Sequence, residues 1–235
     1  MPDRSISNKV TAFLPCRKGS ERVPRKNIRQ FGSFKNGLLE IKLGQLLDCA
    51  LIETVVLSTN DEDIITYAES LKAPGLVIHQ RAEHLCTSMT STDDLVEHAL
   101  SLIPSGHILW THVTSPFVSS KEYEKIVSEY LEALHEGYDS LMTTTQLHAF
   151  LWNEAGPLNY DRQVEKWPRT QTLTPVHEVN SAAFLASADV YSRCNDRIGD
   201  KPKLLPLGRL TALDIDWEED FVIAEQLLIK QRMSV

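Results

Sequence analysis

A dense run of cations follows a short apolar segment near the start of the chain. The apolar segment, Val10 to Leu14, predicts a buried strand, and the cations after it are Arg17, Lys18, Arg22, Arg25, Lys26 and Arg29. The chain as a whole is acidic, with a formal net charge of -8. Ligands of open α/β sheets bind at the carboxyl ends of strands, and Arg and Lys suit phosphate. We therefore predict a site for a small polyanion, in which Arg17 and Lys26 neutralise a triphosphate and backbone N–H groups near Gly19 and Ser20 hold an oxygen. The alternative is a solvated cationic loop.

Two carboxylates stand two residues apart near the other end of the chain. Leu213 to Asp216 predicts a strand, and residues two apart in a strand face the same side. Asp214 and Asp216 could then hold Mg²⁺ that bridges substrate phosphates. The alternative is that Asp216 caps the helix that follows it.

Further polar residues follow other predicted strands. Arg81 comes after the strand Leu76–His79 and would add a third positive charge, or it is an ordinary surface arginine. His112 and Thr114 follow the strand Ile108–Trp110 and could bind a polar ligand, or they form a turn with a satisfied histidine. Walker A, Gly-x-Gly-x-x-Gly and Gly-x-Ser-x-Gly sequences are all absent from the chain.

Strand-like and helix-like segments alternate, which predicts βαβ units and a mostly parallel α/β sheet with flanking helices. Ile108–Trp110 is apolar without alternation, which is typical of a central strand. The predicted strands are Val10–Leu14, Thr54–Ser58, Leu76–His79, Ile108–Trp110, Ser140–Thr144, Ala182–Leu185 and Leu213–Asp216. The predicted helices cover residues 38–51, 62–72, 91–103, 119–135 and 217–231.

Residues 146–180 break this alternation. They contain Trp152, Trp167 and several prolines with little periodicity, and we interpret them as an extended excursion, such as a hairpin arm. The two tryptophans either fill the core or form an oligomer contact.

Length, charge and cysteine content limit the class of protein to which this chain can belong. The 235 residues suit a single domain, and the negative net charge argues against nucleic-acid binding. The four cysteines form no Cys-x-x-Cys pair, which is typical of reduced thiols in the cytoplasm. The first nine residues have no apolar core like that of a signal peptide, and no apolar run approaches the ~20 residues of a membrane span. We expect a cytoplasmic protein with no membrane partner.

Taken together, these motifs resemble the acylneuraminate cytidylyltransferase family. Residues 14–27 (LPCRKGSERVPRKN) are similar to that family's Pro-Ala-Arg-Gly-Gly-Ser-Lys-Arg-Ile-Pro-Arg-Lys-Asn motif. Ser58–Glu62, Arg81–Leu85, Thr114–Pro116 and Asp214–Asp216 resemble further family segments, in family order and over nearly the whole chain.

The resemblance implies a nucleotidyltransferase-type, Rossmann-like fold in one domain, and a homodimer built through an arm at about residues 140–180. It implies CTP as donor, a divalent metal such as Mg²⁺, and an acidic sugar as acceptor. In this reading Arg17, Lys26 and Arg81 hold the phosphates, and Asp214 and Asp216 hold the metal. The nucleotide contacts implied by the family motifs are Asn27 and the backbone near Leu14 at cytosine, with Thr92 nearby; Ser20, at the predicted oxygen cradle, joins them as a nucleotide-binding residue. Arg17, Lys26 and Asp216 are the residues expected to matter most for catalysis.

Departures from the family pattern concentrate where the acceptor is expected. His112 replaces a Gln, and Val118 and Phe184 also differ from the family residues. We predict that His112, Thr114 and Phe184 contact the acceptor, a 2-keto-3-deoxy sugar acid related to sialic acid. The alternatives are a non-sugar acid or phosphonate acceptor, and a catalytically silent homologue that only binds nucleotide.

Overall fold

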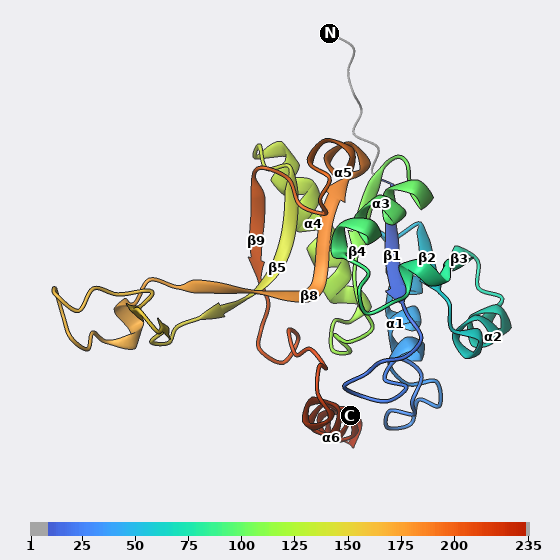
Figure 1. The fold of residues 1–235 in the computed structure, drawn as a ribbon, viewed down its shortest axis with the longest axis horizontal. Coiled ribbons are helices and arrows are strands. Elements are labelled where there is room, and N and C mark those ends of the chain that lie inside the picture. Colours follow the sequence, from blue (N-terminus) through green and yellow to red (C-terminus); the bar gives the residue numbers. More distant parts are fainter. Residues whose placement is uncertain (1–8, 234–235) are drawn as a thin grey trace, which may run out of the picture.

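The computed structural model describes residues 9–233, so most of the segment predicted to lack signal-peptide character lies outside the described residues. A seven-stranded sheet forms the centre of the protein (Figure 1). Its strands are β1 (Val10–Cys16), β2 (Thr54–Thr59), β3 (Leu76–Gln80), β4 (His107–Trp110), β5 (Ser140–Leu147), β8 (Val176–Ser187) and β9 (Pro202–Pro206). The helices are α1 (Gly37–Leu47), α2 (Glu62–Leu71), α3 (Thr92–Leu102), α4 (Ser120–His135), α5 (Ala188–Cys194) and α6 (Glu218–Met233), with short 3₁₀ turns at Glu83–Leu85 and Thr170–Thr172.

The strand order is β3-β2-β1-β4-β8-β5-β9. Strands β1 to β4 pair in parallel, β8 runs antiparallel to both β4 and β5, and β9 is parallel to β5. The prediction of a mostly parallel sheet with Ile108–Trp110 near its centre is therefore confirmed.

Helices cover both faces of the sheet. Buried side chains of α1, α2, α4 and α6 pack with the strands in one core cluster, and those of α3 and α5 pack in another. The two clusters make a three-layer α/β/α body. Within residues 9–233, no helix is both long enough and apolar enough to span a bilayer.

Side-chain caps begin several of the helices. Asp61 accepts from the N–H of Asp63 at the start of α2, and Ser91 and Asp94 form a reciprocal capping box at α3. Ser119 accepts from the N–H of Glu122 at α4. Because α2, α3 and α4 each follow a parallel strand, these caps lie towards the carboxyl edge of the sheet.

The predicted strand Leu213–Asp216 is wrong. This segment is irregular, because the N–H of Ile215 donates to the carbonyl of Thr114 and not to a sheet neighbour. The missed strand is β9, which has proline at both ends. Proline is tolerated there because β9 is an edge strand, where a missing N–H costs no ladder bond.

An arm extends from the body, as expected for residues 146–180. Strand β8 is much longer than the predicted Ala182–Leu185, and it pairs with β5 beyond the body up to Leu147↔Val176. Figure 1 shows these two strands leaving the sheet together and ending in an irregular tip that holds the small hairpin of β6 (Trp152–Asn153) and β7 (Gly156–Pro157). Phe150, Tyr160 and the two arm tryptophans pack on one another there. The tryptophans are therefore not fillers of the main core.

Candidate active site

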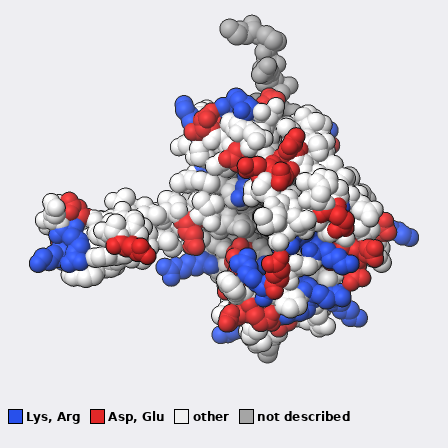
Figure 2. Space-filling model, viewed as in Figure 1, with Lys and Arg blue, Asp and Glu red and all other residues white. Residues whose placement is uncertain are grey.

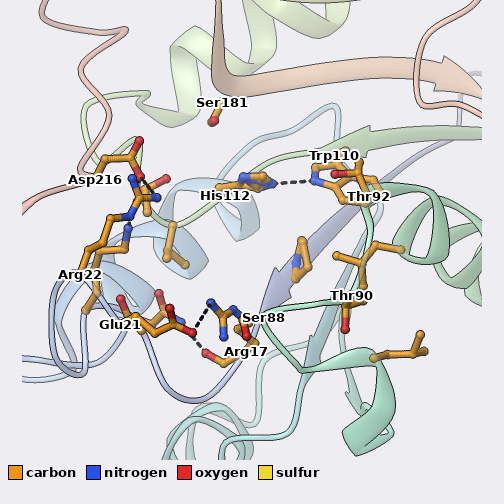
Figure 3. Close-up of a pocket in the computed structure, with 18 of the residues that line it drawn as sticks. Arg17, Glu21, Arg22, Ser88, Thr90, Thr92, Trp110, His112, Ser181 and Asp216 are labelled. Atoms are coloured by element: carbon orange, nitrogen blue, oxygen red, sulfur yellow. Dashed lines mark hydrogen bonds and ion pairs between the residues drawn. The ribbon is translucent and has the colours of Figure 1, made fainter.

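A cavity of about 720 Å³ opens at the carboxyl ends of β1, β3 and β4 (Figure 3). Residues from the basic loop (17–29), from the segments after β3 and β4, and from the segment before α6 line it. Figure 2 shows acidic and basic side chains close together over the lower part of the body, where Figure 1 places the basic loop and α6. The predicted residues that line the cavity are Arg17, Ser20, Lys26, Asn27, Arg81, Thr92, His112, Thr114, Asp214 and Asp216.

Helix α6 fastens the end of the chain to the basic loop. Arg29 donates to both carboxylate oxygens of Glu218, at 3.1 and 2.6 Å, and its guanidinium lies 3.7 Å from the ring centroid of Phe221. Phe31 packs edge-to-face on Phe221, with centroids 5.0 Å apart. These contacts carry the segment just before α6, with its two aspartates, to the cations of the first loop.

The cations of the basic loop divide into two groups. Arg17, Arg22 and Lys26 line the cavity, whereas Arg25 pairs with Asp63 at 2.7 Å and Arg29 with Glu218. Only the first group can meet a ligand in the cavity.

Close backbone packing fixes the end of this loop. Gly37 has φ +59°, and a Cβ there would collide with the carbonyl of Arg29. The N–H of Leu39 donates to the carbonyl of Asn27, whose side chain donates to the carbonyl of Arg17 at 3.1 Å. Asn27 thus joins the two ends of the loop at the cavity wall.

Lys26 lies where the basic loop meets the segment before α6. Its Nζ donates to the carbonyl of Ile215 at 2.6 Å and stands 3.8 Å from Oδ1 of Asp216. Burial lowers the pKa of Lys26, while Asp216 and Asp214 act to raise it. The ammonium is held at 12 % side-chain exposure and faces the cavity.

The two aspartates meet at the cavity without the strand that was predicted to align them. Asp216 accepts from Arg22 at 2.9 Å, and Asp214 accepts from the N–H of Ile215 at 3.1 Å. The N–H groups of Asp216 and Trp217 donate to Asp220, and within residues 9–233 no hydrogen bond joins the Asp216 side chain to a helix N–H.

The donor chemistry of this pair fits Mg²⁺. No group of three or more His, Cys, Asp or Glu side chains within residues 9–233 is arranged to hold a metal ion. Mg²⁺ commonly uses one or two protein carboxylates and takes its other ligands from water and substrate phosphates. Asp214 and Asp216 beside a cavity lined by cations offer that arrangement.

Arg81 is a buried cation and not an ordinary surface arginine. It is 3 % exposed, lines the cavity, and its backbone N–H donates to the carbonyl of Thr59. Its Nε has no hydrogen-bond partner in the part of the chain that the structure describes. A buried guanidinium at a cavity wall is suited to an anionic ligand.

His112 lines the cavity beside Trp110, and its surroundings keep the imidazole neutral. Its Nε2 accepts the indole N–H of Trp110 at 2.7 Å (Figure 3). Burial, together with the nearby positive charge of Arg197, lowers the pKa of His112 to about 3. The proton therefore sits on Nδ1, which makes His112 a hydrogen-bond donor to a ligand.

Phe184, a predicted acceptor contact, is absent from the cavity lining, as are the side chains of Val118 and of Leu14, which was expected to contact cytosine through its backbone. The side chains of Leu14 and Val118 are fully buried in the core, and Phe184 is 4 % exposed and pairs with Trp110 across the sheet. Phe184 does not line the cavity because it faces the α3–α5 layer. Pro15 is the β1 residue that reaches the cavity. Cys16 is buried, and burial raises the pKa of its thiol to about 12, as suits a core residue.

Several lining residues were not predicted from the sequence, among them Thr87, Ser88, Thr90, Ser181 and Arg197. Ser181 comes from β8, whose length was underestimated, and Arg197 comes from the segment between α5 and β9. No sequence motif surrounds Arg197. The departure from the family pattern at Phe184, on the same strand, was the nearest signal for Ser181.

Comparison with known proteins decides the family. The model of the family described as cytidylyltransferase matches residues 11–194. The chain belongs to the cytidylyltransferase family. This family assignment makes it a nucleotidyltransferase, as the sequence motifs predict.

Similar cytidylyltransferases are of similar length or longer. A pseudaminic acid cytidylyltransferase of Campylobacter jejuni is 26% identical over 93% of this chain and 96% of its own. N-acylneuraminate cytidylyltransferase A of Danio rerio is 24% identical over 97% of this chain, which spans 53% of the zebrafish protein.

Solved structures share the fold of this cytidylyltransferase. A CMP:2-keto-3-deoxy-manno-octonic acid synthetase in complex with CTP matches with a TM-score of 0.65 at 14% identity, over 95% of this chain and 99% of that one. A 4-diphosphocytidyl-2C-methyl-D-erythritol synthase from Anaerococcus prevotii matches with a TM-score of 0.66 at 16% identity, over 95% and 98% of the two chains. The nucleotidyltransferase fold predicted from the motifs is confirmed.

Proposed function

We propose that this protein transfers CMP from CTP to a 2-keto-3-deoxy sugar acid and releases pyrophosphate. One observation carries the proposal: a single cavity brings the cations Arg17, Lys26 and Arg81 together with Asp214 and Asp216. The sugar-acid acceptor is supported by the names of the relatives, which include a pseudaminic acid and an N-acylneuraminate cytidylyltransferase.

In the proposed reaction the anomeric hydroxyl oxygen of the acceptor attacks the α-phosphorus of CTP. The bond from that phosphorus to the bridging oxygen breaks, pyrophosphate leaves, and the hydroxyl proton passes to solvent. Arg17, Lys26 and Arg81 neutralise the triphosphate, so the chain contributes mainly by positioning and charge stabilisation. Asp214 and Asp216 would hold Mg²⁺, which supplies further charge neutralisation at the phosphates when bound. Asn27 and the backbone near Leu14 would contact cytosine, with Ser20 and Thr92 beside the nucleotide.

Pyrophosphate release tests this proposal. The purified protein is incubated with CTP, Mg²⁺ and, in turn, an N-acylneuraminate, pseudaminic acid and 2-keto-3-deoxy-manno-octonic acid, and a UTP competition arm tests the base. Release with one of these acids is expected. Release with a non-sugar acid or phosphonate alone would support the alternative acceptor, and CTP binding without release would indicate a silent homologue.

We also propose a homodimer formed through the arm at about residues 140–180. Trp152 and Trp167 stack with centroids 6.4 Å apart and remain 46% and 62% exposed, and Leu158 and Val164 beside them are 58% and 85% exposed. Apolar and aromatic surface of this kind is typical of a subunit contact. The arm carries it away from the body, where a second copy can reach it (Figure 1).

A cytoplasmic location completes the proposal. All four cysteines are free, and Cys16, Cys49 and Cys86 are buried. Reduced buried thiols support a reducing compartment.

A further inference from the structure

Arg197 places a cation on the cavity wall formed by Trp110. Its guanidinium carbon lies 3.8 Å from the ring centroid of Phe184 and 5.3 Å from that of Trp110. Arg197 also lines the cavity, beside His112 and Ser181. Figure 3 shows Trp110, His112 and Ser181 on one side of the cavity and Arg17 with Glu21 on the other. Through its contact with Trp110, Arg197 lies across the cavity from Arg17.

The guanidinium of Arg197 has aromatic support but no polar partner. Within residues 9–233, no hydrogen bond or ion pair joins its side-chain nitrogens to any other side chain or carbonyl. Burial lowers the pKa of Arg197, although Tyr191 and Asp196 act to raise it. Arg197 is half-buried, so its guanidinium is partly shielded from water without a hydrogen-bonded partner among the described residues, and an anionic ligand would offset that cost.

The neighbours of Arg197 in the cavity are hydrogen-bond donors. Because Trp110 donates to Nε2 of His112, the imidazole presents its Nδ1–H to a ligand, and the hydroxyl of Ser181 lies on the same wall. The carboxylates that line the cavity are Glu21, Asp214 and Asp216. Two of these are already engaged, since Glu21 lies 3.9 Å from Arg17 and Asp216 binds Arg22.

The segment that carries Arg197 is held firmly by the start of β5. Asp139 accepts from the N–H groups of Asp200 and Lys201 at 2.9 and 3.0 Å. The N–H of Gly199 donates to Ser140 at 2.8 Å, and a Cβ at Gly199 would collide with the Asp139 carboxylate. The position of Arg197 is therefore set before any ligand binds, which suits the rigid, two-pronged recognition of a carboxylate.

We propose that Arg197 binds the carboxylate of the acceptor acid, with the Nδ1–H of His112 donating to the same group. This inference rests on the proposed function, because it names a contact to the acceptor of that reaction. It assigns Arg197 to acceptor selectivity: acids are accepted and their neutral derivatives are rejected. The Phe184 departure then acts indirectly, as the aromatic surface on which the guanidinium lies.

The test compares Arg197→Gln with wild type in the pyrophosphate assay, using the acid of the panel that wild type uses best. We expect the acceptor KM to rise at least ~30-fold, on the scale of removing one partner of a buried charge pair, while the KM for CTP stays unchanged. Arg197→Lys keeps the charge but loses the two-pronged geometry, so it should recover only part of the loss. Arg209→Gln is the matched control, because Arg209 is exposed and does not line the cavity.

A second arm changes the ligand and leaves the protein intact. The methyl ester of the same acid should show a similarly raised KM with wild type, and Arg197→Gln should no longer distinguish ester from acid. A purely structural role for Arg197 would leave that discrimination in place. An unchanged acceptor KM in Arg197→Gln, a rise confined to the KM for CTP, or equal use of ester and acid by wild type would each overturn the inference while the proposed function stands. Absence of pyrophosphate release from wild type with every acid would instead overturn the proposed function, and the inference with it.

Discussion

The buried side chain of Lys42 predicts that the free energy of unfolding depends on pH. Its side chain is 0% exposed, and its Nζ donates to the carbonyl of Ser115 at 2.8 Å and to the hydroxyl of Tyr123 at 2.7 Å. No carboxylate pairs with it in the described part of the chain, although Asp214 is near enough to act on its charge. Burial therefore lowers the pKa of Lys42 from 10.5 to about 7.

The sign of the pH effect follows from proton binding. In the unfolded chain Lys42 holds its proton up to about pH 10.5, and in the folded protein it releases it near pH 7. Between these values the unfolded state binds more protons, so the free energy of unfolding rises with pH. The shift corresponds to about 5 kcal/mol over that interval, an order-of-magnitude value at 1.4 kcal/mol per unit.

The assay is urea denaturation of wild type and Lys42→Met, followed by tryptophan fluorescence from pH 6 to pH 10. Lys42→Met removes the titration, so the stability difference between the two proteins should shift in favour of wild type as pH rises. Near pH 10 the variant should be less stable by ~1–3 kcal/mol, because the Ser115 carbonyl loses its donor. Near pH 6 that deficit should shrink or reverse, because wild type then buries an ammonium. Parallel pH–stability curves for the two proteins would refute the reasoning.

Three further predictions concern the site and the arm. Asp216→Ala should lower kcat at least ~100-fold, the scale of losing one charge-stabilising group, and near-wild-type pyrophosphate release would remove its role at the metal. Arg17→Ala should raise the KM for CTP, whereas the matched variant Arg25→Ala should not, because Arg25 pairs with Asp63 outside the cavity; equal kinetics of the two variants would contradict the phosphate assignment. Trp167→Ala should shift sedimentation from dimer towards monomer. The control variant Val222→Ser, at an exposed position of α6, should not. A wild-type monomer at micromolar concentration would refute the arm contact.

Local sequence patterns predicted much of the fold. The alternation of strand-like and helix-like segments is a short-range feature, and it predicted the parallel sheet. The arm was also visible, because its prolines and missing periodicity break the pattern at residues 146–180. Strand β9 was missed because proline at both ends contradicts strand propensity, and only its edge position makes those prolines acceptable.

The two aspartates reach the cavity for a different reason from the one predicted. A strand would have aligned Asp214 and Asp216 by its pleat, but the structure holds their segment through Thr114 and Lys26. These partners are distant in the chain, so no spacing rule could reveal them. Phe184, in contrast, was predicted to contact the acceptor, but it does not line the cavity. Its side chain is buried beneath Arg197 and supports the cavity wall from behind.

The sequence alone determined the alternating α/β architecture, the basic loop after β1 and the family motifs, because each depends on residues close together in the chain. Tertiary structure decided which cations face the cavity, how the aspartates join them, and that Arg197 lies on the opposite wall. Those outcomes depend on contacts across long separations, such as Arg29 with Glu218 and Asp139 with the Arg197 segment. Residue type and spacing along the chain do not reveal such contacts, because the contacts form only when the chain folds.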